Sequence, residues 1–167
     1  YRTEVILWED TAKKSPYKSL VHNNLGTAYI SEKRLKEAKK SFEVSLALSP
    51  SSAEPYINLG HIHVRNEEWD KARIKFDLAL KLGTNRSQAF FNSGLMRLRL
   101  DKPEEALPFL LKAIKIKSHR ASYHYELGNA FRKLKQHDLA LNAYRRVLEL
   151  EQNHISRMFF FFFQLQI

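Results

Sequence analysis

Seven histidines are the residues of this sequence best suited to hold a metal ion or to exchange protons near neutral pH. His61 and His63 stand two residues apart, so on a helix they would face different directions. His119 and His124 straddle a predicted turn. The sequence contains no H-E-x-x-H motif and no cluster of histidines and carboxylates at metal-ligand spacing. We therefore expect no metal site and no cofactor.

Carboxylates and nucleophiles show no catalytic arrangement either. The acidic pairs at 67–68 and 104–105 precede predicted helices, where a negative charge offsets the helix dipole. There are no cysteines, which excludes disulfides, zinc–thiolate sites and a thiol nucleophile. Neither a G-x-S-x-G motif nor a glycine-rich phosphate loop occurs. The sequence thus predicts no catalytic residues, and we expect that the protein is not an enzyme.

The charge of the chain favours acidic partners. Its 28 lysines and arginines outnumber 18 aspartates and glutamates, for a net charge of +10. Acidic peptides, nucleic acid and anionic membrane surfaces are all attracted by such an excess. The basic residues are interspersed with acidic ones and form no long run, which favours a solvated helical surface over a nucleic-acid patch.

The elements that position these side chains are indicated by an internal repeat. Glycines recur 34 residues apart, at Gly26, Gly60, Gly94 and Gly128. Twelve residues after each glycine stands an alanine: Ala38, Ala72, Ala106 and Ala140. Four further on comes a large residue: Phe42, Phe76, Leu110 and Tyr144. Three beyond that come Ser45, Ala79, Ala113 and Val147. Four columns in register across four blocks define a repeated structural unit.

Each block contains two stretches with apolar residues at helical spacing, separated by a short polar segment. We name the first predicted helix A and the second helix B. A glycine in helix A costs about 1 kcal/mol against alanine, which is tolerable where it lets helix B approach closely. No single pair buries enough apolar surface alone, so the pairs must stack continuously. The predicted organisation is a preceding second helix at 1–18, four repeats at 19–52, 53–86, 87–120 and 121–154, and an apolar tail at 155–167.

The period and the residues "NNLGTAY…KEAKKSFEVSLALSP" resemble the tetratricopeptide repeat (TPR) over residues 19–154. This resemblance implies an all-α fold, a right-handed α-solenoid of antiparallel helix pairs known as the TPR superhelix. It also implies a non-catalytic scaffold that binds proteins. A second, weaker resemblance links "LWEDTAKKSP" to repeat regions that follow membrane domains in some large bacterial proteins.

In the TPR family, helix A lines the concave groove in which ligands lie. At that face, the residues two positions before each glycine are Asn24, Asn58, Asn92 and Glu126. One position after each glycine stand Thr27, His61, Leu95 and Asn129. A carboxamide can both donate to and accept from a peptide backbone amide. The superhelical domain of the O-linked N-acetylglucosamine transferase family has a similar asparagine ladder. Alternatively, the asparagines satisfy neighbouring helix groups or water.

A basic column adds positive charge to the same face, with Arg65, Arg99 and Lys133 each five residues after a glycine. These side chains would attract an acidic ligand, unless they form an ordinary solvated surface. We expect a protein or peptide partner, extended or helical. Two alternatives stay open. One is an RNA-binding α-solenoid, although this sequence has neither a repeated base code nor a series of aromatic residues for base stacking. The other is a repeat appendage of a membrane glycosyltransferase-like protein.

The two ends of the chain lead to separate predictions, one about the parent protein and one about self-association. The chain opens at Tyr1 without an initiator methionine or a signal-peptide pattern, and we expect a piece of a longer protein. A cytoplasmic location is expected, with attachment to a membrane only through flanking sequence. At the other end, Phe159–Phe163 are five consecutive phenylalanines, apolar all round. We expect this segment to promote self-association, and a further helix could form within it.

Overall fold

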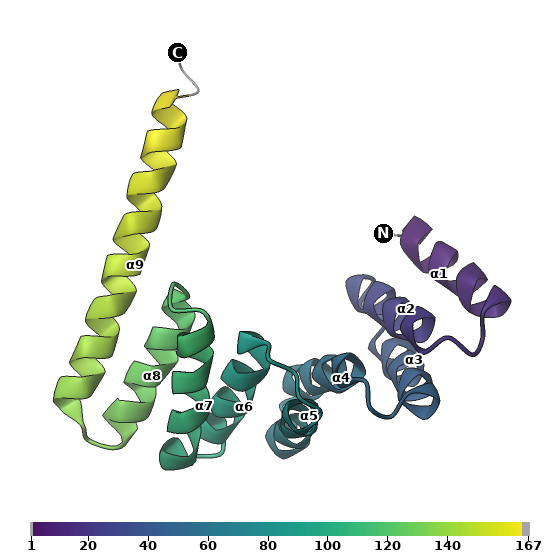
Figure 1. Ribbon diagram of the computed structural model, residues 1–167, viewed down its shortest axis with the longest axis horizontal. Helices are drawn as coiled ribbons and strands as arrows, with labels where there is room; N and C mark the ends of the chain where they lie inside the picture. Colours follow the sequence, from purple (N-terminus) through teal and green to yellow (C-terminus); the bar gives the residue numbers. More distant parts are fainter. Residues whose placement is uncertain (1, 165–167) are drawn as a thin grey trace. The chain divides into compact units, whose positions relative to one another are not determined.

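The computed structural model describes the backbone of residues 2–164 and the side chains of residues 4–152. In this part of the chain every regular element is an α-helix (Figure 1). The chain divides into two compact units, unit 1 (Tyr1–Asn85) and unit 2 (Arg86–Ile167). Unit 1 contains α1 (Arg2–Lys14), α2 (Ser19–Ser31), α3 (Leu35–Leu48), α4 (Ala53–Arg65) and α5 (Trp69–Lys81). Unit 2 contains α6 (Ser87–Arg99), α7 (Pro103–Ile116), α8 (Ala121–Lys133) and α9 (His137–Gln164).

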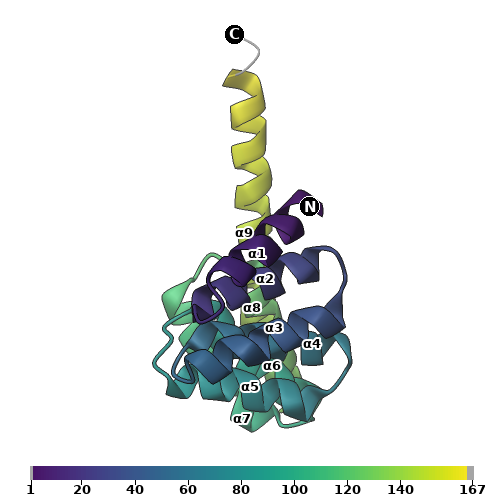
Figure 2. The same ribbon diagram turned by 90° about the vertical axis from the view of Figure 1, so that its right-hand side faces the viewer.

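Within each unit the helices pack as consecutive pairs, α2 with α3 and α4 with α5, then α6 with α7 and α8 with α9 (Figures 1 and 2). Helix α1 packs on α2, so it takes the place of a second helix before the first pair. The prediction of an all-α solenoid built from helix pairs is confirmed, and so is the presence of two helices in each 34-residue period.

The glycine column marks the closest approach within each pair. A Cβ atom added to Gly26 would lie 2.5 Å from the Phe42 ring, and one added to Gly60 would lie 2.6 Å from the Phe76 ring. Both rings are completely buried. The large residue of helix B therefore packs directly over the glycine of its own pair. The predicted close approach of helix B to the glycine of helix A is therefore present in these pairs.

The turn within each pair has a regular backbone geometry that the sequence analysis did not predict. One residue per repeat has a positive φ between 56° and 61°: Lys33, Glu67, Asp101 and Lys135. In the first repeat, the Arg34 N–H donates to the Tyr29 carbonyl and the Lys33 N–H to the Ile30 carbonyl. This is the Schellman motif, which ends a helix with a left-handed residue. Because none of the four residues is a glycine, their residue types do not indicate a left-handed backbone.

Helix α9 differs from the expectation for the tail. The sequence allows a further helix within the tail, whereas α9 continues as one helix from His137 to Gln164. The side chains of Phe159–Phe163 lie outside the described residues, so self-association through them stays a proposal. We expect light scattering to report a larger particle for the full chain than for a chain ending at residue 155. Equal masses for both would contradict the proposal.

Among the residues that the structure describes, no helix has both the length and the apolar character needed to cross a bilayer.

Candidate functional site

The predicted groove residues of unit 1 gather where the A helices α2 and α4 lie beside each other. Here the surface has a hollow of about 420 Å³. We call it the α2–α4 hollow, and it is lined by Thr27, Ile30, Asn58, His61, Val64 and Arg65. Four of these six were predicted from the columns flanking the glycines. Helical spacing explains the grouping, since positions 58, 61 and 65 fall on one face of α4.

Hydrogen bonds hold the polar side chains of this hollow in place. The Asn58 Nδ2 donates to the Asn23 Oδ1 at 3.1 Å, and the Thr27 Oγ1 donates to the Asn23 carbonyl at 3.1 Å. The Asn58 Oδ1 accepts no hydrogen bond from the described residues, so it can still accept one from a ligand. Asn24 is partly buried and does not line the hollow. The partner of Asn58 is thus Asn23, which sequence reasoning had not assigned to the ladder.

His61 and Arg65 bring different charges to the same hollow. The His61 ring packs edge-on against Phe76, with the ring centroids 5.3 Å apart. Although the residue as a whole is exposed, this crowding desolvates the imidazole and lowers the pKa of His61, and the nearby positive Arg65 lowers it further. The imidazole is therefore neutral at pH 7. Arg65 is exposed and has no ion pair with any described residue.

Unit 2 has a corresponding hollow of about 260 Å³ between the A helices α6 and α8. We call it the α6–α8 hollow, and it is lined by Leu95, Leu98, Arg99, Glu126, Asn129, Arg132 and Lys133. Five of the seven were predicted groove residues; Leu98 and Arg132 were not. Arg132 follows Asn129 by three residues on α8, and this helical spacing was the signal that could have found it.

The polar residues of the α6–α8 hollow are also fixed by neighbours. The Asn129 Nδ2 donates to the Glu126 carboxylate at 3.1 Å. The Asn129 Oδ1 accepts a hydrogen bond of 2.8 Å from the Tyr144 hydroxyl. Because both ends of this amide are engaged, Asn129 can bind a ligand only by sharing or exchanging these bonds. Glu126 partly offsets the positive charge of the arginines here.

Asn92 lies apart from both hollows. The residue is 6% exposed, and its Oδ1 accepts a hydrogen bond of 3.0 Å from the Gln88 Nε2. The asparagine column therefore contains residues in unlike surroundings, with Asn58 at a hollow and Asn92 buried.

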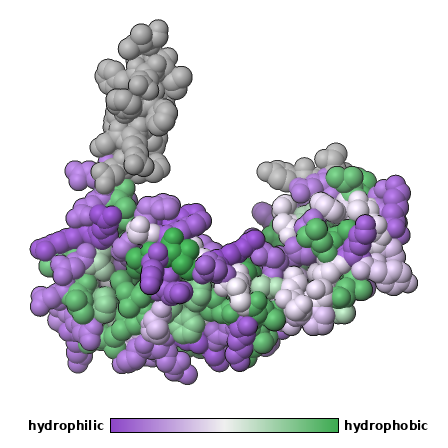
Figure 3. Space-filling view, in the orientation of Figure 1, coloured by the Kyte–Doolittle hydropathy of each residue, from purple (hydrophilic) through white to green (hydrophobic). Residues whose placement is uncertain are grey.

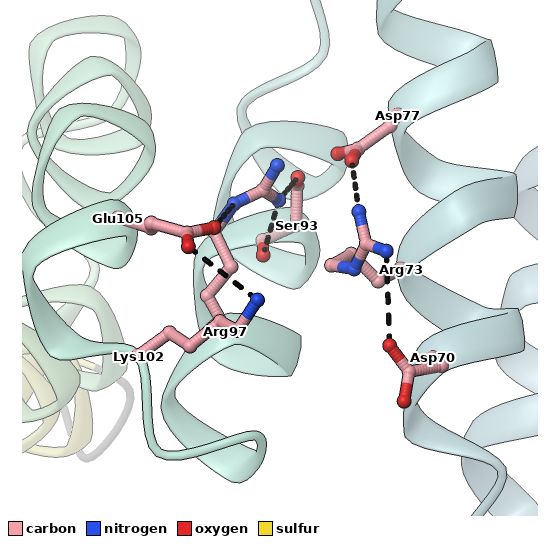
Figure 4. Close-up of polar contacts among 7 residues, drawn as sticks. All are labelled: Asp70, Arg73, Asp77, Ser93, Arg97, Lys102 and Glu105. Atoms are coloured by element: carbon pink, nitrogen blue, oxygen red, sulfur yellow. Dashed lines mark hydrogen bonds and ion pairs between the residues drawn. The ribbon is translucent and has the colours of Figure 1, made fainter.

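Several basic residues are neutralised inside their own unit. In unit 1, Arg73 lies between Asp77 at 3.3 Å and Asp70 at 3.7 Å (Figure 4). In unit 2, Arg97 bonds to Ser93 and pairs with Glu105 at 3.7 Å, again shown in Figure 4.

The basic column of the groove is itself divided by such pairing. Lys133 pairs with Asp101 at 2.6 Å. Arg99, like Arg65, is exposed and has no ion pair with a described residue. On the face drawn in Figure 3, polar and apolar side chains are intermixed. Arg65 and Arg99 are thus the two predicted groove cations whose charge remains available to a ligand.

The residues that the structure describes include no group of three or more histidines, aspartates and glutamates placed to hold a metal ion. Paired amides, exposed arginines and apolar side chains suit recognition of a polypeptide through hydrogen bonds and charge.

Family models identify this class of protein. Three models described as tetratricopeptide repeat match residues 20–52, 57–121 and 121–154. Together with the helix pairs and the glycine columns, these matches show that the chain belongs to the tetratricopeptide-repeat family. No curated protein sequence matches the chain.

Solved structures share the fold at low sequence identity. A crystal structure of MamA is 22% identical, with a TM-score of 0.82 over 91% of this chain and 89% of that chain. The protein YrrB, described as a TPR protein with an unusual peptide-binding site, is also 22% identical, with a TM-score of 0.82 over 89% of this chain and 77% of that chain. The pilF protein of Pseudomonas aeruginosa is 20% identical, with a TM-score of 0.77 over 86% of this chain and 66% of that chain.

Proposed function

We propose that this protein is a non-catalytic scaffold that binds a peptide segment of another protein along the groove of its A helices. TPR proteins generally act as protein-interaction scaffolds, and the likeness to YrrB, a peptide-binding member, supports this proposal. The observation that carries it is the clustering of predicted groove residues around one hollow in each unit.

The chemistry of the two hollows favours a particular kind of peptide. At the α2–α4 hollow the free Asn58 Oδ1 can accept a backbone N–H, and Ile30 and Val64 supply apolar contact. Arg65 in unit 1 and Arg99 in unit 2 each attract a carboxylate. The preferred ligand is therefore a peptide with acidic residues and at least one apolar side chain. Extended and helical peptides both satisfy these contacts.

The test replaces Asn58 with alanine. A suitable probe is the tightest peptide obtained from a random library selected on the full chain. If Asn58 holds the peptide backbone, Asn58→Ala leaves a ligand amide unpaired and weakens binding about tenfold. Titration calorimetry measures this effect, and the thermal unfolding midpoint should change little because the Asn58 side chain is only partly buried.

Two further asparagines provide matched controls. Asn142 is an exposed helical asparagine that lines neither hollow, so Asn142→Ala should leave binding unchanged. Asn24→Ala distinguishes a contact at the hollow from a ladder along the whole column, because Asn24 does not line the hollow. If Asn58→Ala binds normally but unfolds at a lower temperature, the asparagine is structural and the proposed contact is wrong.

A further inference from the structure

A second pocket lies in unit 1 on the side formed by the B helices, and none of the predicted groove residues lines it. It has a volume of about 510 Å³, within the range usual for ligand pockets. Leu46 of α3, Leu59 of α4 and Ile74 of α5 form its apolar part. Ile74 is 47% exposed, so an isoleucine that could be buried by a partner remains in contact with water.

Lysines from two helices border this apolar part. Lys39 stands on α3, and Lys71 and Lys75 stand on α5. Lys71 is already neutralised, because its Nζ lies 2.6 Å from the Glu68 carboxylate. The same carboxylate lies 2.6 Å from the His63 Nδ1, and these two contacts hold the pKa of Glu68 at about 2, so Glu68 stays ionised.

The two other lysines are bound more loosely. Lys39 and Glu43 are 3.9 Å apart, beyond ordinary hydrogen-bond distance. Lys75 lies over the Tyr56 ring at 5.7 Å from the centroid, near the outer limit of a cation–π contact. Each lysine can therefore turn to an incoming carboxylate at little cost. The pocket therefore combines an apolar centre with one loosely bound lysine on each of two helices, Lys39 on α3 and Lys75 on α5.

We propose that this B-helix pocket, lined by Leu46, Leu59, Ile74, Lys39 and Lys75, is a second protein-binding surface for an apolar side chain flanked by acidic residues. The apolar side chain packs on Ile74 and Leu46, while flanking carboxylates pair with Lys39 and Lys75. Such an occupant complements both the apolar centre and the basic border. An RNA strand suits the pocket less, because the aromatic ring of its described lining, His63, is buried and bonded to Glu68, and because the lining includes Glu43.

The probe is a synthetic peptide in which one leucine is flanked on each side by two glutamates. Isoleucine methyl NMR of the full chain distinguishes the sites, because Ile74 reports on the B-helix pocket and Ile30 on the α2–α4 hollow. We expect the Ile74 signal to shift during the titration, and a shift of Ile30 in addition would report separate binding of the same peptide in the α2–α4 hollow. A peptide with lysines in place of the glutamates, or serine in place of the leucine, should produce no comparable shift.

Charge reversal supplies the matched comparison. Lys39→Glu/Lys75→Glu should weaken binding of the acidic peptide roughly tenfold, since two attractions become repulsions. Lys36→Glu/Lys40→Glu makes the same change in net charge at exposed positions of α3 that do not line the pocket, and should leave the affinity within about twofold. Ile74→Ser should weaken binding about fivefold through lost apolar contact.

Three outcomes would overturn the inference. A shift of Ile30 alone would place the acidic peptide in the A-helix groove, which supports the proposed function and rejects the second surface. Equal loss of affinity in both double variants would show non-specific attraction by net charge. A shift of Ile74 with an RNA oligonucleotide, and none with the peptide at millimolar concentration, would assign the pocket to nucleic acid.

Discussion

Replacing Gly60 with leucine should destabilise unit 1 by about 3 kcal/mol, the upper part of the usual range for overpacking a core. Intrinsic helix propensity predicts the opposite sign, because leucine is favoured over glycine by nearly 1 kcal/mol inside a helix. Packing should prevail, since even a single added carbon would lie 2.6 Å from the Phe76 ring. That ring is completely buried and cannot move into solvent without opening the core.

Two controls separate packing from backbone effects in this prediction. Gly83 has a φ of +81° and nothing within 4 Å of an added Cβ. Gly83→Ala and Gly83→Leu should therefore cost about the same, roughly 1 kcal/mol of backbone strain. At position 60, by contrast, leucine should cost clearly more than alanine. Denaturant unfolding of the four variants measures the differences.

A double-mutant cycle then tests the named contact between Gly60 and Phe76. Phe76→Ala alone should cost about 3–5 kcal/mol through the cavity it leaves. Combined with Gly60→Leu, the total should fall short of the sum by at least about 1 kcal/mol, because the leucine occupies part of that cavity. Strict additivity, or a Gly60→Leu variant as stable as the parent, would disprove the packing role of the glycine column.

The helix pairs could be predicted from the sequence because the residues that pack at their crossings belong to characteristic types. A glycine at position 26 and a phenylalanine at position 42 are complementary in size, and the 34-residue period repeats this complementarity. The left-handed turn residues could not be predicted, because their residue types do not indicate their backbone conformation. Lys33 and Glu67 have no side-chain property that demands a positive φ, and the helix ends impose it through backbone hydrogen bonds.

The candidate site could be predicted only in part, because a column fixes the direction of a side chain but not its surroundings. Asn58 and Asn92 occupy equivalent positions, yet one lines a hollow and the other is buried beside Gln88. Lys133 belongs to the basic column, but Asp101 neutralises it. Contacts of this kind depend on residues from neighbouring helices, whose identities vary from repeat to repeat. The B-helix pocket could not be predicted from the repeat, because most of its residues stand outside the columns that define it.

Reversing the groove arginine of either unit, as Arg65→Glu in unit 1 or Arg99→Glu in unit 2, should weaken an acidic peptide bound in the hollow of that unit about tenfold at low salt. Each reversal replaces an attraction with a repulsion, and about tenfold per site is reasonable for a charge that contacts the ligand directly. Both side chains are exposed and have no ion pair with the described residues, so the substitutions break no internal pair and should leave the unfolding midpoint nearly unchanged.

The dependence on salt distinguishes this effect from the loss of a hydrogen bond. At about 1 M salt the screening length falls to about 3 Å, and the tenfold difference should shrink to about twofold. The roughly tenfold effect of Asn58→Ala should persist there, because a hydrogen bond at contact distance is not screened. Arg120→Glu changes the net charge equally at an exposed position outside both hollows, and should cost about twofold at most. If this control variant weakens binding as much as the groove variant, the ligand responds to the overall charge of the protein, and the peptide does not lie between the A helices.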